Sequence, residues 1–460
     1  FTGAGATTVQ TNQDSIQFNS GTIQLAASTP LTINSAGGAI TVTSVMSAGT
    51  TADNDVTINA NSDFSGENDG ATTIDSETIS IGAVGAVSDI GKLKLDAADG
   101  VTLSGNITLA DAADADLDVN SKAFISGDVT ISTDTGGTDG TIDFASTIDG
   151  VDDSTDDNLV LLSGDNGGAL SLGGVIGGGV ALTSLDINQS AGTIALNIPG
   201  IGGANPGVTG ATRIGNTGSG DITFTADGAT AYNFGGALTV TSDGGAGAFT
   251  FTNSPTIKAG GTVAFNEGSG TDDTMVLADL KTLTIDTSTA GADITLANFD
   301  GTANGGDGIA NDGSDLTIDA GSGTVNLESI DTDINDLQVT GATIKLGGSI
   351  TTAATTPTGG DLDPAQITLT GNVELEAATI TLASGGGDVT LSAKVDSDSG
   401  NNRALVINSG AGDVAINGAI GTTDALGNLS IDDGTGGATG AGNISLSTVG
   451  ADNAAGAAVM

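Results

Sequence analysis

The sequence predicts an all-β protein built as a parallel β-helix, or β-solenoid, with about three short strands in each coil of roughly 20–30 residues. Apolar residues occur in pairs separated by one residue, which indicates short strands with one buried face. The same spacing returns along the chain, which indicates a repeat architecture. The 460 residues include only 11 Phe, 1 Tyr and no Trp, so the core is expected to be narrow and aliphatic.

The repeat is clearest in residues 405–421, LVINSGAGDVAINGAIG. Counted from Leu405, apolar residues follow at +2, +9 and +11, with a glycine-containing loop between the two pairs. The same spacing recurs in LTINSAGGAITV from Leu31, LDINQSAGTIAL from Leu185, LTIDAGSGTVNL from Leu316 and ITLASGGGDVTL from Ile380. Units that start at positions 380, 405 and 429 are 25 and then 24 residues apart. We interpret each apolar pair as one strand and residues 409–413 as a corner, where glycine allows a sharp bend.

Antiparallel hairpins are the competing architecture, because they also use alternating apolar residues. Connectors of similar composition and a cycle that closes within one repeat favour stacked coils instead. We expect a single elongated solenoid over residues 1–460, with an irregular loop insertion near 199–220 and a frayed or truncated tail at 451–460. The chain starts with Phe1, so it is interpreted as a processed protein or a fragment.

The charge and composition exclude several classes of function. The chain has 56 acidic and 9 basic residues, a net charge of −47, which repels nucleic acid and anionic lipid and attracts cations. No segment has the roughly 20 apolar residues of a membrane helix, so no membrane insertion is expected. The absence of Cys and His removes disulfides, thiolate and imidazole metal ligands, and the commonest nucleophiles and bases.

Two long segments carry a family resemblance: ITLTGNVELEAATITLASGGGDVTLSAKVD, from Ile367, and LVINSGAGDVAINGAIG. They resemble the repeats of large secreted bacterial β-solenoid proteins of the filamentous-haemagglutinin and giant-adhesin type. As a style of repeat, the resemblance covers most of residues 30–450. It implies a right-handed coil, secretion, and a role in adhesion or in surface fibres. We therefore expect an extracellular or cell-surface location.

Acidic loops supply the candidate ligand residues. Ca²⁺ takes 6–8 oxygen ligands from carboxylates, carbonyls and water, which such loops provide. The sequence predicts no required cofactor, with Ca²⁺ as the ion that these loops could bind. The alternative is that they are solvated loops that keep the chain soluble. The candidate Ca²⁺ ligands are Asp152, Asp153, Asp156, Asp157, Asp307, Asp312, Asp315, Asp331, Asp333 and Asp336.

Two weaker patterns remain open. Thr-x-Thr pairs would expose hydroxyls in the manner of ice-binding solenoids, but threonine is common in any strand and these pairs are irregularly placed. They lie at 40–44, 222–226, 238–242 and 249–253. Glycan attachment is open at the Asn-x-Ser/Thr sequons of Asn106, Asn188, Asn428 and Asn443.

The favoured function is a non-enzymatic structural segment of an extracellular fibre, sheath or giant adhesin. Such a segment would act as a rigid rod that self-associates, stacking end to end into filaments or a surface lattice. The alternative is a surface-layer or adhesin module that binds a receptor, glycan or Ca²⁺ through its loops. A polysaccharide-active β-helix enzyme is less favoured, because only Arg213 and Arg403 are available as arginine bases and the charge repels a polyanionic substrate.

Overall fold

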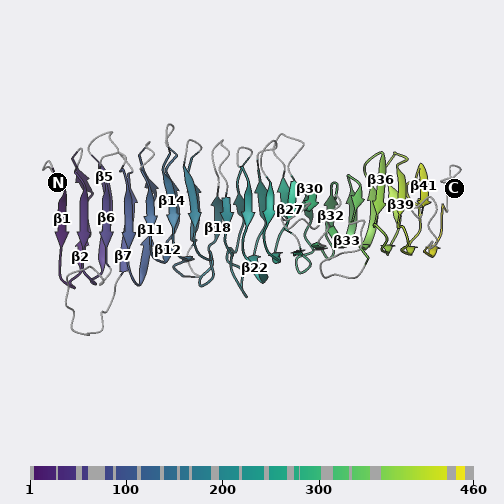
Figure 1. Cartoon of the computed structure of the whole chain (residues 1–460). Coiled ribbons are helices and arrows are strands. Elements are labelled where there is room, and N and C mark those ends of the chain that lie inside the picture. The colour runs from purple at the N-terminus through teal and green to yellow at the C-terminus, as the bar shows by residue number, and fades with distance from the viewer. Residues whose placement is uncertain are drawn as a thin grey trace, which may run out of the picture. The chain divides into compact units, whose positions relative to one another are not determined.

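The computed structural model is all-β, and its strands run parallel to one another in a β-solenoid, as the sequence predicts (Figure 1). No helix occurs in the described ranges, so none of them contains a helix that could span a membrane. The described ranges are 5–26, 29–47, 54–60, 78–85, 90–110, 115–134, 139–152, 156–164, 168–187, 196–216, 220–242, 248–266, 274–278, 280–301, 314–330, 334–352, 364–432 and 442–450.

The chain divides into two compact units. Unit 1 comprises Phe1–Ile222, Tyr232–Gly236 and Val240–Gly247, and unit 2 comprises Thr223–Ala231, Ala237–Thr239 and Ala248–Met460. Three strands contribute residues to both units: β21 (Ile222–Phe224), β22 (Gly228–Phe234) and β23 (Leu238–Thr241).

Seven strands of unit 1 form one parallel sheet in the order β1-β4-β6-β8-β11-β14-β17. Its register is constant, because Leu31 pairs with Val56 and Val56 with Leu93, and all three side chains are buried. The strands are β1 (Thr7–Gln10), β4 (Leu31–Asn34), β6 (Val56–Asn59), β8 (Leu93–Asp96), β11 (Leu117–Val119), β14 (Thr141–Phe144) and β17 (Ala169–Leu172).

The other strands of unit 1 complete the remaining sides of its coils, and they also pair in parallel. They are β2 (Ile16–Phe18), β3 (Ile23–Leu25), β5 (Ile40–Ser47), β7 (Thr78–Val84), β9 (Gly100–Leu103), β10 (Ile107–Thr108), β12 (Ala123–Ile125), β13 (Asp128–Ser132), β15 (Ile148–Gly150), β16 (Asn158–Leu162), β18 (Ser184–Ile187), β19 (Leu196–Ile198) and β20 (Thr212–Ile214).

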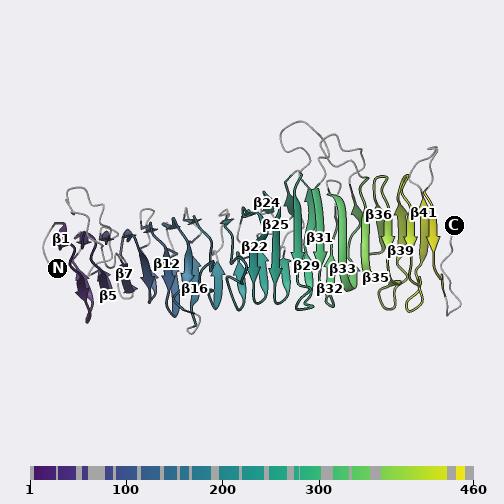
Figure 2. The same ribbon diagram turned by 90° about the horizontal axis from the view of Figure 1, so that it is seen from below.

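Unit 2 repeats this plan, and Figure 2 shows its strands β31, β33 and β35 side by side. Its strands are β24 (Phe249–Phe251), β25 (Pro255–Ala259), β26 (Val263–Asn266), β27 (Thr274–Leu277), β28 (Thr282–Asp286), β29 (Ile294–Leu296), β30 (Asn298–Gly301), β31 (Ser314–Asp319), β32 (Thr324–Leu327), β33 (Ile334–Leu346), β34 (Ile350–Thr351), β35 (Ile367–Leu375), β36 (Thr379–Ala383), β37 (Val389–Leu391), β38 (Val395–Ser397), β39 (Ala404–Asn408), β40 (Val414–Ile416), β41 (Asn428–Asp432) and β42 (Ile444–Leu446).

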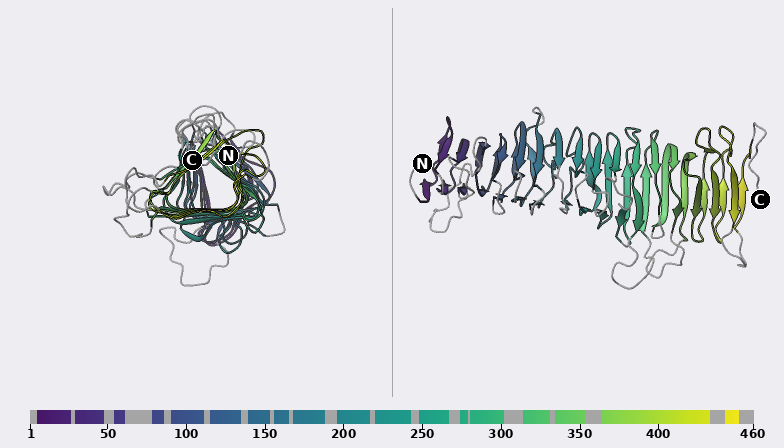
Figure 3. Two further views of the ribbon diagram at one scale, coloured as in Figure 1. Left: turned by 90° about the vertical axis from the view of Figure 1, so that its right-hand side faces the viewer. Right: turned by 90° about the horizontal axis from the view of Figure 1, so that it is seen from above.

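One coil of unit 2 contains three strands, β36, β37 and β38, and the next begins at β39. Ile380 pairs with Leu405, and Leu405 pairs with Leu429. These pairings confirm the spacings of 25 and 24 residues that the sequence gives for positions 380, 405 and 429. The coils of unit 2, green to yellow in Figure 3 (left), trace a path with three sides.

The core of each unit is built from the inward residues of these strands. Leu405 and Ile407 are fully buried, and Val414 and Ile416 nearly so, which confirms that both apolar pairs of this repeat are core residues. Between them, the amide of Gly412 donates to the carbonyl of Ser409 at 3.0 Å, and the Ser409 hydroxyl donates to the Gly412 carbonyl at 2.8 Å. Residues 409–413 therefore form a corner, as predicted.

Segment 199–220, expected to be a loop insertion, contains three buried core residues, Ile201, Val208 and Ile214, the last of them in β20. Ile201 forms parallel bridges with Ile176 and Tyr232, and Val208 forms them with Leu182 and Phe234. The glycines between these short bridges prevent recognition of the alternating pattern in the sequence. The tail at 451–460 lies outside the described residues.

Candidate functional site

Five of the ten predicted Ca²⁺ ligands fall in the described part of the chain. Asp152 and Asp156 are exposed, Asp157 is buried, and Asp315 and Asp336 are half-buried. No group of three or more acidic side chains in the described ranges is arranged to hold a metal ion. The other five, Asp153, Asp307, Asp312, Asp331 and Asp333, lie outside the described residues.

Asp157 accepts hydrogen bonds from two backbone amides of unit 1. Its Oδ1 accepts from the amide of Gly127 at 2.8 Å, and its Oδ2 accepts from the amide of Val151 at 2.9 Å. A fully buried carboxylate requires such donors, because burial without them would be costly. These bonds give Asp157 a structural role.

Asp315 and Asp336 lie on adjacent coils of unit 2, close together on its outer face. The amide of Asp336 donates to Asp315 Oδ1 at 3.3 Å, and the amide of Gln366 donates to Asp336 Oδ1 at 3.0 Å. The Thr282 hydroxyl donates to Asp315 Oδ2 at 3.5 Å. Together with Thr317 and other polar residues, these side chains line an open depression of about 230 Å³. This face is our candidate functional surface.

Asp315 and Asp336 belong to a longer column, which we call the corner ladder. Its members occupy equivalent positions in successive coils of unit 2, each immediately or shortly before an inward residue near the start of a strand. Side-chain oxygens link most neighbours along the column. The corner ladder consists of Asp227, Ser254, Thr282, Asp315, Asp336, Gln366, Asp388, Asp413 and Asn443.

Strand geometry explains why a polar side chain is needed at this position. The amide of Val389, the first inward residue of β37, donates to the carbonyl of Asp413 in the following coil at 2.9 Å. Successive amides of a strand point in opposite directions, so the amide one residue earlier points to the preceding coil. In the preceding coil the strand has not yet begun at this level. A side chain of that coil therefore supplies the acceptor for this amide. In the next coil, for example, Asp388 Oδ1 accepts from the amide of Asp413 at 2.7 Å.

The sequence contains a signal for this column that local clusters of acidic residues do not reveal. Asp or Asn stands directly before the first aliphatic residue of many strands, as in Asp388–Val389, Asp413–Val414 and Asn443–Ile444. An acid at this position accepts a hydrogen bond from a backbone amide of the neighbouring coil, as Asp388 and Asp413 do.

A second outward column runs beside the corner ladder, two residues further along each strand. Threonine occupies most of its positions, and the Thr-x-Thr pairs singled out from the sequence contribute none of them. Its members are Thr256, Thr284, Thr317, Gln338, Thr368, Thr390, Ala415 and Ser445. The candidate functional surface is therefore an array made mainly of hydroxyl, amide and carboxylate groups.

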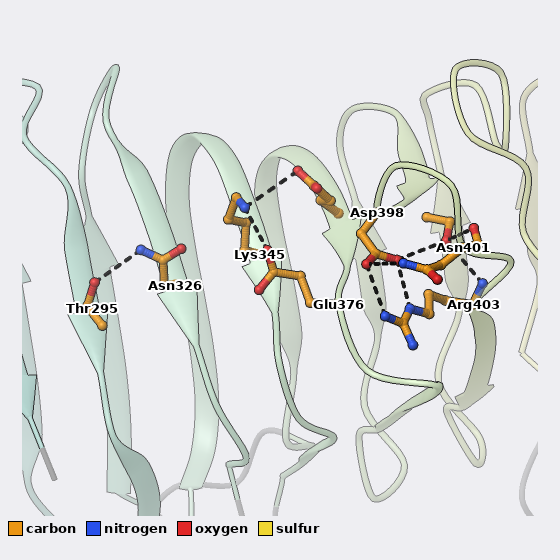
Figure 4. A network of polar contacts seen from close by, with 9 residues as sticks. Thr295, Asn326, Lys345, Glu376, Asp398, Asn401 and Arg403 are labelled. Carbon is orange, nitrogen blue, oxygen red and sulfur yellow. Dashed lines mark hydrogen bonds and ion pairs between the residues drawn. The ribbon is translucent and has the colours of Figure 1, made fainter. Parts of the chain in front are cut away.

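Ion pairs cluster on another side of unit 2 (Figure 4). Lys345 Nζ lies 2.6 Å from Glu376 Oε1, beside a bond of 3.1 Å from Asn326 Nδ2 to Thr295 Oγ1. Two parallel bonds join Arg403 to Asp398, from Nε to Oδ1 at 2.7 Å and from Nη2 to Oδ2 at 3.0 Å. The Asn401 amide also donates to Asp398 Oδ2, at 2.7 Å. Such bidentate geometry orders the corner between β38 and β39.

The Arg403 guanidinium lowers the pKa of Asp398 from 3.8 to about 2, with further help from Asn401. We expect Arg403→Gln to return this pKa towards 3.8, as measured by NMR titration of the Asp398 carboxyl group. Because the pKa is lowered in the folded state, the stability from this pair is complete above about pH 4 and is lost as the pH falls towards 2.

The control for this titration is Lys281→Gln, which removes the same charge from another coil and should leave the Asp398 pKa unchanged. An Asp398 pKa that stays near 2 in Arg403→Gln would contradict the assignment of the shift to Arg403.

Lys394 and Asp396 form a neighbouring pair, with 2.9 Å between Nζ and Oδ2. Burial raises the pKa of Asp396, but hydrogen bonds from Lys394 and Thr423 outweigh this effect and the net pKa is lowered. The pair lines a depression of about 170 Å³ together with Glu374 and Asp424. The amide of Thr423 donates to Asp396 Oδ1 at 3.1 Å, and this bond holds the loop that contains Thr423 against β38.

Neither column nor ion-pair cluster brings together a nucleophile, a base and a substrate-sized pocket within the described residues. The stacked parallel coils support the resemblance to secreted solenoid proteins at the level of repeat architecture. Comparisons with protein-family models, with curated proteins and with solved structures find no match to this chain.

Proposed function

We propose that this chain is a non-enzymatic structural segment of an extracellular fibre, sheath or giant adhesin. The observation that supports this most strongly is the parallel pairing of strands from coil to coil, which keeps core residues aligned above one another in β36, β39 and β41 and in β37 and β40. Each coil contacts its neighbours along several strands, so a load applied along the stack is shared by many backbone hydrogen bonds. Stiffness of this kind suits a mechanical element.

We further propose that the segment associates with copies of itself. Any open stack of parallel coils leaves unpaired strand edges at its two ends, and pairing with another chain satisfies them. Association of one end with the other is heterologous, so it generates filaments unless the rotation closes into a ring. This proposal explains why the surface is so acidic, since like charges suppress sideways aggregation.

Electron microscopy of the purified full chain, in buffer with physiological salt, tests this proposal. We expect filaments whose length increases with protein concentration. Separate particles that bind cells or a glycan array would instead favour a receptor-binding or surface-layer module. Depolymerisation of a polyuronate by the same material would revive an enzymatic function and would contradict the proposal.

Dependence on cations forms a separate prediction. With a net charge of −47, the folded chain should be stabilised as salt screens its self-repulsion, so the midpoint of thermal unfolding should rise with NaCl. If loops also bind Ca²⁺ in an ordered site, micromolar to millimolar Ca²⁺ should raise the midpoint beyond an NaCl control of equal ionic strength. If a chelator leaves the midpoint of thermal unfolding unchanged in low salt, an ordered Ca²⁺ site is excluded.

A further inference from the structure

A set of hydrogen bonds between the coils of unit 2 runs in one direction along the chain. In each of ten such bonds, a backbone amide donates to a side-chain oxygen in the coil before it. The donors and acceptors are Ser254 to Asp227, Thr282 to Ser254, Thr324 to Asp293, Ser329 to Asn298, Asp336 to Asp315, Gln366 to Asp336, Thr381 to Ser349, Asp413 to Asp388, Thr423 to Asp396 and Asn443 to Asp413.

Unit 1 provides a comparison, because its bonds of this kind run both ways. The amide of Thr141 donates back to Asp116 Oδ1 at 2.8 Å. In the opposite direction, the amide of Thr29 donates forward to Asn54 Oδ1 at 2.7 Å. A stack of coils therefore does not require all bonds from backbone amides to side-chain oxygens to run in the same direction along the chain. At most of these acceptors in unit 2 the common direction follows from placing the polar residue directly before an inward residue near the start of a strand, whereas Asp396 lies within β38.

We propose that these bonds couple the coils of unit 2 directionally, so that the side chain of each coil holds the corner of the coil that follows it. Removing an acceptor side chain leaves the backbone bonds of its own corner in place. The amide that it served lies in the following coil and loses its protein partner. The loosened backbone is consequently found one coil further along the chain.

Asp388 and Asp413 make this asymmetry testable, because the donor and acceptor of both bonds lie among the described residues. Asp388 Oδ1 holds the amide of Asp413 at 2.7 Å, and Asp413 Oδ1 holds the amide of Asn443 at 2.6 Å. Both acids are exposed, so their replacement creates no cavity and the chain should still fold. Since water competes at an exposed position, the expected effect is moderate.

Hydrogen exchange of the full chain, followed by mass spectrometry of short peptides, measures the effect. In Asp388→Ala, exchange in residues 409–414 should be about two- to tenfold faster, which corresponds to one net hydrogen bond. Residues 384–389, which contain the substitution, should exchange at an unchanged rate after correction for the new side chain. In Asp413→Ala, the faster exchange should move to the corner that contains Asn443.

Two further variants separate the hydrogen bond from the charge. Asp388→Asn keeps an acceptor oxygen and removes the charge, so its exchange should resemble that of the unsubstituted chain. Asp424→Ala removes an equal charge nearby and should leave residues 409–414 unaffected. Equal acceleration in the preceding and following corners, or an asparagine variant that behaves like the alanine variant, would overturn the proposal. Unchanged exchange in Asp388→Ala would overturn it as well.

Discussion

Replacing Phe251 with alanine is expected to lower the free energy of unfolding of unit 2 by about 3–5 kcal/mol. The side chain is fully buried, and its ring stacks on that of Phe224 with centroids 4.9 Å apart and planes 14° apart. The ring of Phe265 meets it edge-on, with centroids 5.9 Å apart. The substitution removes this packing and leaves a cavity.

The cavity should persist because the surrounding backbone is held by strand pairing. Phe251 of β24 pairs with Leu277 of β27, and the amide of Thr252 donates to the carbonyl of Phe224. These bonds prevent the coils from moving together to fill the space, so the cost lies towards the upper end for large-to-small substitutions. The measurement is a shift of the urea-unfolding midpoint at an unchanged slope.

Phe124→Ala is the matched control. Phe124 lies in β12 with its side chain on the outer face and half-buried, so its removal exposes a surface that water can cover. A loss below about 1.5 kcal/mol is expected there. Equal losses for Phe124→Ala and Phe251→Ala would contradict a structural role for the aromatic cluster.

The repeat itself could be predicted from the sequence, because burial in a narrow solenoid imposes a strict alternation. At Leu405 and Ile407, one residue out of two faces the core, and the next coil repeats the pattern at Leu429 and Ile431. A spacing maintained over two coils leaves few other ways to bury these side chains. The aromatic cluster was not anticipated, because Phe224, Phe251 and Phe265 become neighbours only when three separate strands are stacked.

The partners of the outward face could not be predicted from local sequence, because they lie about 25 residues away along the chain. Local acidity predicts Asp315 and Asp336 as Ca²⁺ ligands, and this stays a prediction. In the structure, each carboxylate accepts the amide of the next coil. Local composition cannot distinguish these roles, but the position of the acid relative to the first aliphatic residue of the strand can.

The glycines at the corners are the basis of the second large prediction. The sequence indicates glycine at corners because the backbone must bend there, and a positive φ of 61° at Gly410 agrees with that reason. Gly412 is required for a different reason. A Cβ built on it would lie 2.0 Å from the carbonyl oxygen and 2.2 Å from the carbonyl carbon of Gly387 in the preceding coil. The same close approach recurs at Gly387 and Gly442.

Gly412→Ala is therefore expected to destabilise unit 2 by about 3 kcal/mol or more, at or above the usual cost of overpacking. The atoms that the new methyl group meets belong to the backbone, so no side-chain rotation can relieve the clash. Relief requires the two coils to separate locally, which would weaken the bond from the amide of Asp413 to Asp388. Urea unfolding measures the loss, and hydrogen exchange should locate it in residues 409–414.

Gly203→Ala is the control that isolates close approach from the general effect of adding a methyl group. A Cβ at Gly203 would meet nothing within 4 Å, and its φ lies outside the region that favours glycine. Alanine there should be neutral or should stabilise by about 0.4–1 kcal/mol, because it restricts the unfolded chain. If both variants lost the same stability, the spacing between coils would not be the reason for glycine at position 412. If only Gly412→Ala is destabilised, the recurrent glycine before the corner acid sets how closely successive coils of unit 2 can stack.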